Sequence, residues 1–259
     1  MDAGAKLGYV TLTMKLIFLG TAGYHPSETR HTSCLMLPEV GVVLDAGSGM
    51  FRVRDRLTTS TLDIFLTHAH LDHIWGVSFL FDTCHGKSME RVTLHGEATK
   101  LTAIQTHLLA HDLFPAQLPF VAAPLKDPVP LAEGGKLTHF PLDHPGGSVG
   151  FRLDWPGRSM AYITDTTARP DAPYIPHIRG VDLLVHECNF PDSQQEWAEK
   201  TGHSCLTSVL KLAAAAQVGR LVLTHMDPLN SSEDPVGLAA ARQLFPSTTI
   251  ARDLMEVEF

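Results

Sequence analysis

Short apolar runs separated by glycine, proline and polar residues dominate the pattern along the chain. Runs of about four to eight residues bounded by turn-forming residues predict β-strands. In the first half we expect strands at Lys15–Gly20, Ser33–Leu37, Gly41–Leu44, Leu62–Leu66 and Arg91–Leu94. In the second half we expect them at Lys136–Phe140, Val149–Leu153, Ser159–Thr164, Val181–His186, Arg220–Thr224, Thr248–Arg252 and Met255–Phe259.

Helical spacing of apolar residues marks a smaller number of segments. The helices that we expect are Ile74–Phe81, Glu97–Leu109, Ser204–Val218 and Val236–Leu244, with Ser204 as an N-cap and Gly219 just beyond the C-terminus of its helix. Residues 112–135 contain five prolines, which predicts a loop or the edge of a sheet. Strands that alternate with helices in this way fit two packed sheets with helices outside.

The composition is that of an ordinary globular protein. The chain has 259 residues, of which 44% are hydrophobic, so we expect one domain over 1–259 with a sizeable core. The formal net charge of −8 argues against a protein whose main task is to grip nucleic acid. The 15 histidines stand out, because histidine is the commonest metal ligand and titrates near neutral pH.

The cysteines and the N-terminus indicate a soluble cytoplasmic protein. Four cysteines without a Cys-x-x-Cys pair predict free, mostly buried thiols. No apolar run approaches the length of a membrane span, and none resembles the apolar core of a signal peptide. Residues 1–13 show no pattern, so we expect them to be disordered or to precede the native start at Met14.

The sharpest chemical signal follows directly after the predicted strand Leu62–Leu66. The next seven residues contain three histidines and one aspartate, namely His68, His70, Asp72 and His73. A solvated loop rarely needs three imidazoles so close together, and a buried core would not accept them without partners. These residue types are metal ligands. A sharp turn would direct the first two and the last two to different sides, which suits two adjacent metal ions better than one.

Three further strand ends carry metal-binding residue types. His144 and Asp165 lie just beyond strands of the second half, and His225 follows the strand Arg220–Thr224. Each alone has an ordinary explanation as a surface or capping residue. All three, however, repeat the position of His68 relative to a strand, so together they predict the missing ligands of a two-metal site.

These residues resemble the ligand set of the metallo-β-lactamase superfamily, and the resemblance covers nearly the whole chain. The seven residues occur in the same order as the metal ligands of that superfamily. Asp45, within residues 42–47, matches its first motif, an aspartate that supports the metal ligands without itself binding the metal. The resemblance implies an αββα sandwich of two mixed β-sheets flanked by helices. It also implies the following ligand sets: His68, His70 and His144 for one metal, Asp72, His73 and His225 for the other, and Asp165 as the bridge.

Finer motifs are similar to those of the ribonuclease Z-like phosphodiesterases within that superfamily. Phe18–Gly23 and Arg30–Ser33 look like the N-terminal strand and loop of that branch. His186–Phe190 looks like its His-Glu-Ala-Thr motif, although Cys and Asn replace Ala and Thr. Gly202–Cys205 looks like its His-Ser-Thr motif, with Cys205 in place of Thr.

These motifs imply a proton donor. In that branch the Glu of the first motif orients the His of the second, which protonates the leaving group. The catalytic residues implied for this chain are therefore Glu187, His203 and the ligand Asp72. Acyl hydrolysis has less need of such a donor, so the pair favours phosphodiester chemistry.

The resemblance implies a metal-dependent hydrolase with two divalent metal ions. Histidine and carboxylate ligands suit zinc, although manganese and iron accept them as well. Ribonuclease Z itself grips transfer RNA with a long arm inserted between the residues that match His144 and Asp165. Predicted strands fill that interval here. We therefore expect a small phosphodiester or cyclic nucleotide as substrate rather than a nucleic acid polymer. Because the related branch is often dimeric, a homodimer is possible.

Other functions stay open on the sequence alone. They are a ribonuclease Z-type tRNA 3′ endonuclease, an acyl hydrolase such as a lactonase or thioesterase, a non-catalytic ligand-binding module, and a redox member of the superfamily. The intact ligand set argues against the binding module. No residues remain for the flavin domain of a flavodiiron protein, and a mononuclear iron enzyme such as a persulfide dioxygenase does not need Asp72 in the same way.

Overall fold

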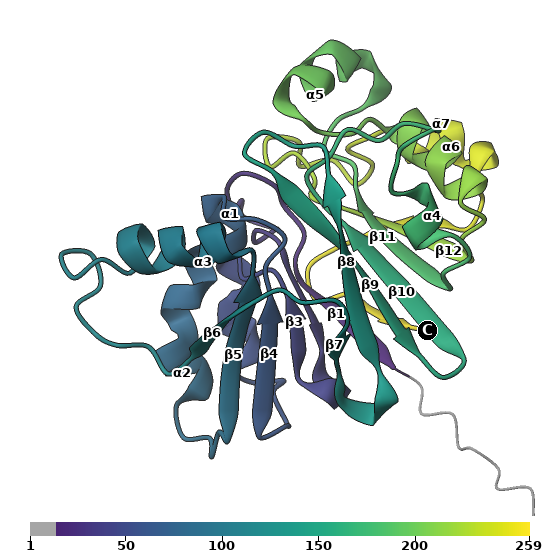
Figure 1. Ribbon diagram of the computed structural model, residues 1–259. Helices are drawn as coiled ribbons and strands as arrows, with labels where there is room; N and C mark the ends of the chain where they lie inside the picture. Colours follow the sequence, from purple (N-terminus) through teal and green to yellow (C-terminus); the bar gives the residue numbers. More distant parts are fainter. Residues whose placement is uncertain (1–13) are drawn as a thin grey trace, which may run out of the picture.

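Both faces of the central strands are buried, which explains why their sequences are apolar almost throughout. In β1 (Lys15–Gly20), Leu16 and Phe18 pack between two β-sheets, whereas Ile17 and Leu19 pack against helices. The computed structural model describes residues 14–259 and shows the two sheets face to face with helices on their outer sides (Figure 1). The expected αββα sandwich is confirmed, and the expectation for residues 1–13 lies outside the described residues.

The first sheet has the strand order β14-β1-β2-β3-β4-β5-β6. Strands β14, β1, β2 and β3 pair antiparallel, and β3 to β6 pair parallel. The bounds are β2 Cys34–Leu37, β3 Val42–Leu44, β4 Thr61–Phe65, β5 Arg91–Gly96, β6 Val121–Pro124 and β14 Glu256–Glu258.

The second sheet has the order β13-β12-β11-β10-β9-β8-β7. Strands β7 to β10 pair antiparallel, and β10 to β13 pair parallel. The bounds are β7 Val129–Pro130, β8 Lys136–Leu142, β9 Ser148–Trp155, β10 Arg158–Ile163, β11 Leu183–Glu187, β12 Arg220–Thr224 and β13 Thr248–Ile250. The proline-rich residues 112–135 supply one edge strand to each sheet, β6 and β7, as the prediction of a loop or edge allowed.

Helices cover the outer face of each sheet, and Figure 1 shows α5 standing apart at the end of the sandwich. On the first sheet they are α1 Leu71–Ile74, α2 Leu80–Cys84 and α3 Ala98–Ala103, and on the second α4 Ile175–Ile178, α6 Leu206–Ala215 and α7 Leu238–Ala241. Helix α5 is Gln195–Thr201. Three apolar clusters fill the layers, one between the sheets and one under each set of helices.

Several predicted helices differ from the structure. The expected helix Ile74–Phe81 is interrupted by a 3₁₀ segment, Trp75–Phe79. A side chain at Gly76 would meet the Gly47 carbonyl oxygen at 2.3 Å, so the backbone at Gly76 packs directly against the backbone at Gly47. The expected helices at residues 97–109 and 236–244 are likewise completed by a π turn and a 3₁₀ turn. Helices α4 and α5 were not predicted.

Ser204 is not the N-cap of helix α6. Cys205 holds that position without a side-chain cap, and the helix ends at Ala215, so Gly219 is not its first residue beyond the C-terminus either. The Ser204 hydroxyl instead donates to the Thr166 carbonyl at 2.6 Å and accepts from the Ala168 amide at 2.9 Å. This serine therefore holds the loop that follows β10.

The C-terminal ends of β4, β8, β10 and β12 meet at one edge of the sandwich, and the predicted ligands follow them. This is the edge at which parallel strands of both sheets stop, and it is where side chains from distant segments converge. Within residues 14–259, no helix is long and apolar enough to cross a membrane. The four cysteines form no disulfide; Cys84 is half-buried and the others are buried.

Candidate functional site

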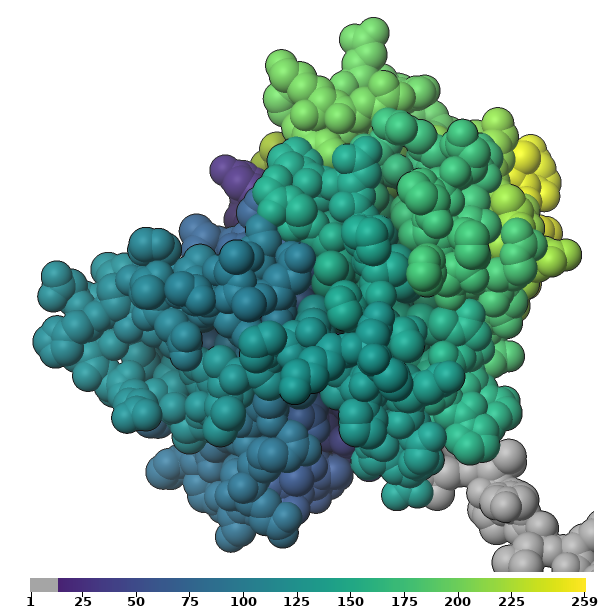
Figure 2. All heavy atoms as spheres, in the orientation of Figure 1, coloured from purple at the N-terminus to yellow at the C-terminus, as the bar shows by residue number. Residues whose placement is uncertain are grey.

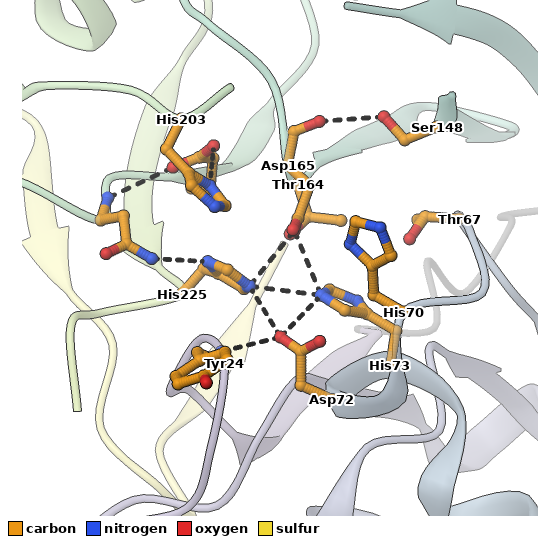
Figure 3. A network of polar contacts seen from close by, with 12 residues as sticks. Tyr24, Thr67, His70, Asp72, His73, Ser148, Thr164, Asp165, His203 and His225 are labelled. Atoms are coloured by element: carbon orange, nitrogen blue, oxygen red, sulfur yellow. Dashed lines mark hydrogen bonds and ion pairs between the residues drawn. The ribbon is translucent and has the colours of Figure 1, made fainter. Parts of the chain in front are cut away.

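All seven predicted ligands come together at this edge, and Figure 3 shows five of them, His70, Asp72, His73, Asp165 and His225. In each of two groups, one potential ligand atom from every member lies within 4.8 Å of the others. The first group consists of His68, His70, His144 and Asp165, and the second of Asp72, His73 and His225. These groups match the two ligand sets implied by the sequence motifs.

Asp165 lies between the two groups, as a bridging carboxylate would. Its Oδ1 is 3.1 Å from His73 Nε2 and 3.2 Å from His225 Nε2. Its Oδ2 is 3.6 Å from the Nε2 atoms of both His68 and His144. Figure 3 shows the carboxylates of Asp165 and Asp72 on opposite sides of the His73–His225 pair. One oxygen thus faces each group.

The ligand rings are oriented by partners on their outer sides. His144 Nδ1 donates to the Gly202 carbonyl at 2.9 Å, and His73 Nδ1 donates to Asp45 Oδ2 at 2.8 Å. His225 Nδ1 lies 3.1 Å from the side-chain amide of Asn189. In metal sites, the second nitrogen of a ligating histidine almost always has such a partner.

The histidine nitrogens that face the centre of the cluster are better placed to bind metal ions than to hydrogen-bond to one another. His73 Nε2 and His225 Nε2 lie 3.2 Å apart, and His144 Nε2 lies 3.3 Å from His70 Nδ1. The Nε2 atom of His68 is buried without a hydrogen-bond partner. A buried polar atom is rarely left unsatisfied, so this arrangement is that of a divalent metal site.

The electrostatics of the cluster favour cations. Burial and neighbouring His73 lower the pKa of His68 well below its ordinary value, which leaves a lone pair for a metal. Burial also opposes a charge on His73, but the carboxylates of Asp165, Asp72 and Asp45 outweigh it and raise the pKa of His73. Burial acts against a charge on Asp165 too, yet the surrounding histidines hold its pKa well below the usual range.

Asp45 supports the site as its motif implied. Besides His73, its carboxylate accepts hydrogen bonds from the Thr67 amide at 2.8 Å and the Tyr162 hydroxyl at 3.0 Å. Asp45 follows β3 with φ +58°, and Asp165 and His225 follow their strands with φ +44° and +59°. Such left-handed residues cost about 1–3 kcal/mol each, and they turn the chain sharply where the strands end.

Glu187 and His203 form the predicted pair. Glu187 is fully buried at the end of β11, and its Oε1 lies 3.0 Å from His203 Nδ1. The carboxylate also accepts from the amides of Thr166, Asn189 and Ser204 at 2.9–3.2 Å. The substitutions in the two motifs, Cys188, Asn189 and Cys205, therefore leave the pairing in place.

The pair keeps the His203 ring protonated at neutral pH. Burial opposes the charge, but the Glu187 carboxylate and its hydrogen bond outweigh it and raise the pKa of His203 to about 9. His203 also has a nitrogen within 4.8 Å of ligand atoms of Asp165 and His225. Because Nδ1 is engaged by Glu187, Nε2 is the nitrogen that can give a proton to a reacting group.

Tyr24 and Gly23 belong to the site but were not singled out from the sequence. The Tyr24 amide donates to Asp72 Oδ2 at 2.8 Å, and the residue has φ +59°. A side chain at Gly23 would lie 2.4 Å from the His225 ring, so only glycine fits there. The sequence had marked Phe18–Gly23 through its resemblance to the N-terminal strand and loop of the ribonuclease Z-like branch, but not as part of the site. His31, by contrast, lies apart from the cluster, 3.1 Å from the Ser48 hydroxyl.

Comparison with known proteins identifies the family. Residues 41–226 match the model of the beta-lactamase superfamily domain. The chain belongs to the β-lactamase superfamily. The ribonuclease Z of Acaryochloris marina (strain MBIC 11017) is 29% identical over 95% of this chain and 97% of its own length.

Two solved structures are similar in fold. The metallo-beta-lactamase fold protein YhfI from Bacillus subtilis has a TM-score of 0.81 at 21% identity, over 96% of this chain and all of that chain. A diphosphatase from the PhnP family has a TM-score of 0.74 at 20% identity, over 96% of this chain and 98% of that chain. The predicted resemblance to the metallo-β-lactamase superfamily and its ribonuclease Z-like branch is confirmed, and the chain is a metal-dependent hydrolase.

Proposed function

We propose that this superfamily member is a phosphodiesterase with two divalent metal ions, which acts on small phosphodiesters such as cyclic nucleotides or nucleoside cyclic phosphates. The observation that carries the proposal is the pair of Glu187 and His203 beside the bridging Asp165. Phosphodiesters have poor leaving groups, and a fixed proton donor is the help that their hydrolysis needs.

The residues of the site have different roles in the proposed reaction. Zinc ions, held by His68, His70, His144 and Asp165 on one side and by Asp72, His73, His225 and Asp165 on the other, would supply an activated water and neutralise phosphoryl charge. His203 protonates the departing alkoxide through Nε2. Glu187 holds the ring in position through Nδ1 and stabilises its charged form.

Three observations support a small substrate. The interval between His144 and Asp165 is occupied by a short turn and by β9 and β10, which are joined by a turn at residues 156–157, so it contains no protruding arm. The alignment with the Acaryochloris ribonuclease Z runs over 310 positions although the chain has 259 residues, so that relative has insertions that this chain lacks. The net charge of −8 also opposes a polyanion at long range.

A ribonuclease Z-type tRNA 3′ endonuclease is the second candidate, because the ribonucleases Z of Acaryochloris marina and Methanosarcina acetivorans are among the relatives of the chain. A single panel separates the candidates. Phosphodiesters, phosphomonoesters, lactones, thioesters and unprocessed transfer RNA are assayed while bound metal is measured. Turnover of small phosphodiesters with little transfer RNA cleavage supports the proposal. Tight transfer RNA binding at physiological salt with accurate 3′ processing would overturn it, and preferred hydrolysis of lactones or thioesters would indicate an acyl hydrolase.

A homodimer, which the resemblance to the related branch suggests, is also a proposal. It is tested by the molar mass of the protein in solution.

A further inference from the structure

A cavity of about 770 Å³ opens beside the metal cluster. Its walls come from three regions far apart in the sequence: the turn after β1, the loop after β11 together with helix α5 that follows it, and the loop after β12. Figure 2 shows the purple segment near the start of the described chain at the surface, below the light green atoms of α5. The volume lies within the range of about 300–1,000 Å³ that is typical of small-molecule sites.

Three large apolar side chains line this cavity and are exposed to solvent. Tyr24 is 81% exposed, Trp197 53% and Leu229 83%. The ammonium group of Lys200 lies over the Trp197 ring, 5.4 Å from its centroid. Exposed aromatic rings that gather at a concave surface are typical of ligand recognition rather than of folding.

A few polar groups accompany these apolar walls. Asn189, Gln194 and Asp227 line the same cavity. One carboxylate oxygen of Asp227 accepts the Leu229 amide at 2.9 Å, which fixes the loop and leaves its second oxygen as a possible acceptor. Flat apolar surface with a few hydrogen-bonding groups suits a planar ring that has polar edges, as a nucleobase has.

The cavity is joined to the catalytic centre by His203. This residue lines the cavity, and it also lies next to Asp165 and His225 in the cluster. Asn189 links them as well, because it lines the cavity and contacts the His225 ring. A substrate whose phosphate lies at the cluster and whose departing oxygen lies at His203 therefore extends its leaving group into this cavity.

We propose that the cavity is the leaving-group subsite and that it binds a nucleoside, with the base stacked on Trp197 and Tyr24. This inference rests on the proposed phosphodiesterase function and adds the side of the diester on which the nucleoside is recognised. Figure 3 places Tyr24 and His203 toward one end of the cluster and His70 toward the other. The retained ester group is thus directed away from the aromatic residues.

The bonds that change follow from this placement. The oxygen of a water molecule bonds to phosphorus, and the bond between phosphorus and the nucleoside oxygen breaks. The electron pair of that bond stays on the nucleoside oxygen, which takes the proton from His203 Nε2. His203 regains a proton from the attacking water. From an acyclic diester the products are a free nucleoside and a phosphomonoester that carries the retained group. A cyclic nucleotide, in which both ester oxygens belong to one nucleoside, opens instead to a nucleoside monophosphate.

Methyl esters of thymidine 3′-phosphate and thymidine 5′-phosphate test this assignment, because each contains two possible leaving alcohols. Hydrolysis yields either thymidine with methyl phosphate or thymidine monophosphate with methanol. We expect the metal-loaded wild-type protein to release mainly thymidine from at least one ester. In Trp197→Ala the ratio of thymidine to thymidine monophosphate from that ester should fall about fivefold or more, the lower end of the loss when one base–aromatic stack is removed. Trp197→Phe should restore most of it.

Phe81→Ala is the matched control. Phe81 is an aromatic residue of similar exposure, 47%, and lines a separate groove. Its removal should leave the product ratio unchanged. Release of mainly thymidine monophosphate from both esters, or an unchanged ratio in Trp197→Ala, would show that the cavity does not hold the leaving group. Hydrolysis of neither these esters nor any other phosphodiester would instead contradict the proposed function itself.

Discussion

The two halves of the chain supply their predicted ligands in different ways. In the first half, one loop and the start of α1 carry four of them within six residues. Hydrogen bonds from Thr67 and His73 to Asp45 hold this segment in place. In the second half, His144, Asp165 and His225 come from three separate strand ends. The first arrangement is local and can be recognised as a cluster in the sequence, whereas the second exists only because the strands end at the same edge.

The strongest test of this comparison is Asp165→Ala, because Asp165 is the point at which the two halves meet. Without the bridging carboxylate, four histidine nitrogens lose their common partner. We expect the variant to lose most of the roughly two metal ions predicted for each chain. Elemental analysis measures the loss, and His139→Ala, which lies outside the cluster and contacts Asp127, is the control. Full metal content in Asp165→Ala would disprove the bridge.

His203→Ala tests the contribution of the second half to the chemistry. Turnover of a diester with an alkoxide leaving group should fall about 10²–10⁴-fold, whereas turnover of one with a nitrophenolate leaving group should change little. A good leaving group departs without protonation, which is why the two substrates should differ. Equal losses on both substrates, measured as kcat, would assign His203 to binding or to the fold.

Glu187→Gln should have a smaller effect of the same kind, about tenfold on the alkoxide substrate at neutral pH. His203 is active as an acid below its pKa, so activity is lost as the pH rises through that value. Removal of the Glu187 charge takes away the main effect that raises this pKa toward 9. The alkaline limb of the pH–rate profile should therefore move to lower pH. A limb that stays in place would rule out Glu187 as the residue that stabilises the charged ring.

The smallest expected effect concerns the stability of the first sheet, in which charged side chains form ion pairs between β4 and β5. Burial opposes the charge of Asp63, but His95 at 2.9 Å and Arg91 outweigh it and lower its pKa to about 2. Its stabilising contribution is thus present above pH 3.8 and is lost as the pH falls through about 2.

Asp63→Asn should accordingly cost about 1 kcal/mol near pH 6, since solvent screens the partly exposed group. This corresponds to a decrease in Tm of about 2–4 °C. The difference from wild type should shrink between pH 4 and pH 2. Thermal unfolding followed across that range checks this, and a difference that does not depend on pH would mean that the ion pairs contribute nothing.

The strands were predicted well because both of their faces are buried, and continuous apolar runs follow from that. Helix α5 was missed because it packs few residues: Ala198 is its buried residue, and Trp197 points its exposed ring to a cavity instead of the core. Ser204 has the composition of an N-cap, yet its hydroxyl bonds to the loop after β10. Local propensity does not record which distant segment a hydroxyl will reach.

The sequence by itself indicated the fold class, through the strand pattern and the resemblance to the superfamily, and it predicted seven ligands, because residue type, order and position after a strand are properties of the chain. It also indicated the pair of Glu187 and His203 through short motifs. Only the tertiary structure decided that Asp165 faces both ligand groups, that Asn189 contacts the His225 ring, and that Tyr24 and Trp197 share one cavity with His203. The pairs Asp165 and His73, Asn189 and His225, and Tyr24 and Trp197 are each more than thirty positions apart. Their proximity arises from strand pairing and left-handed turns that no local pattern specifies.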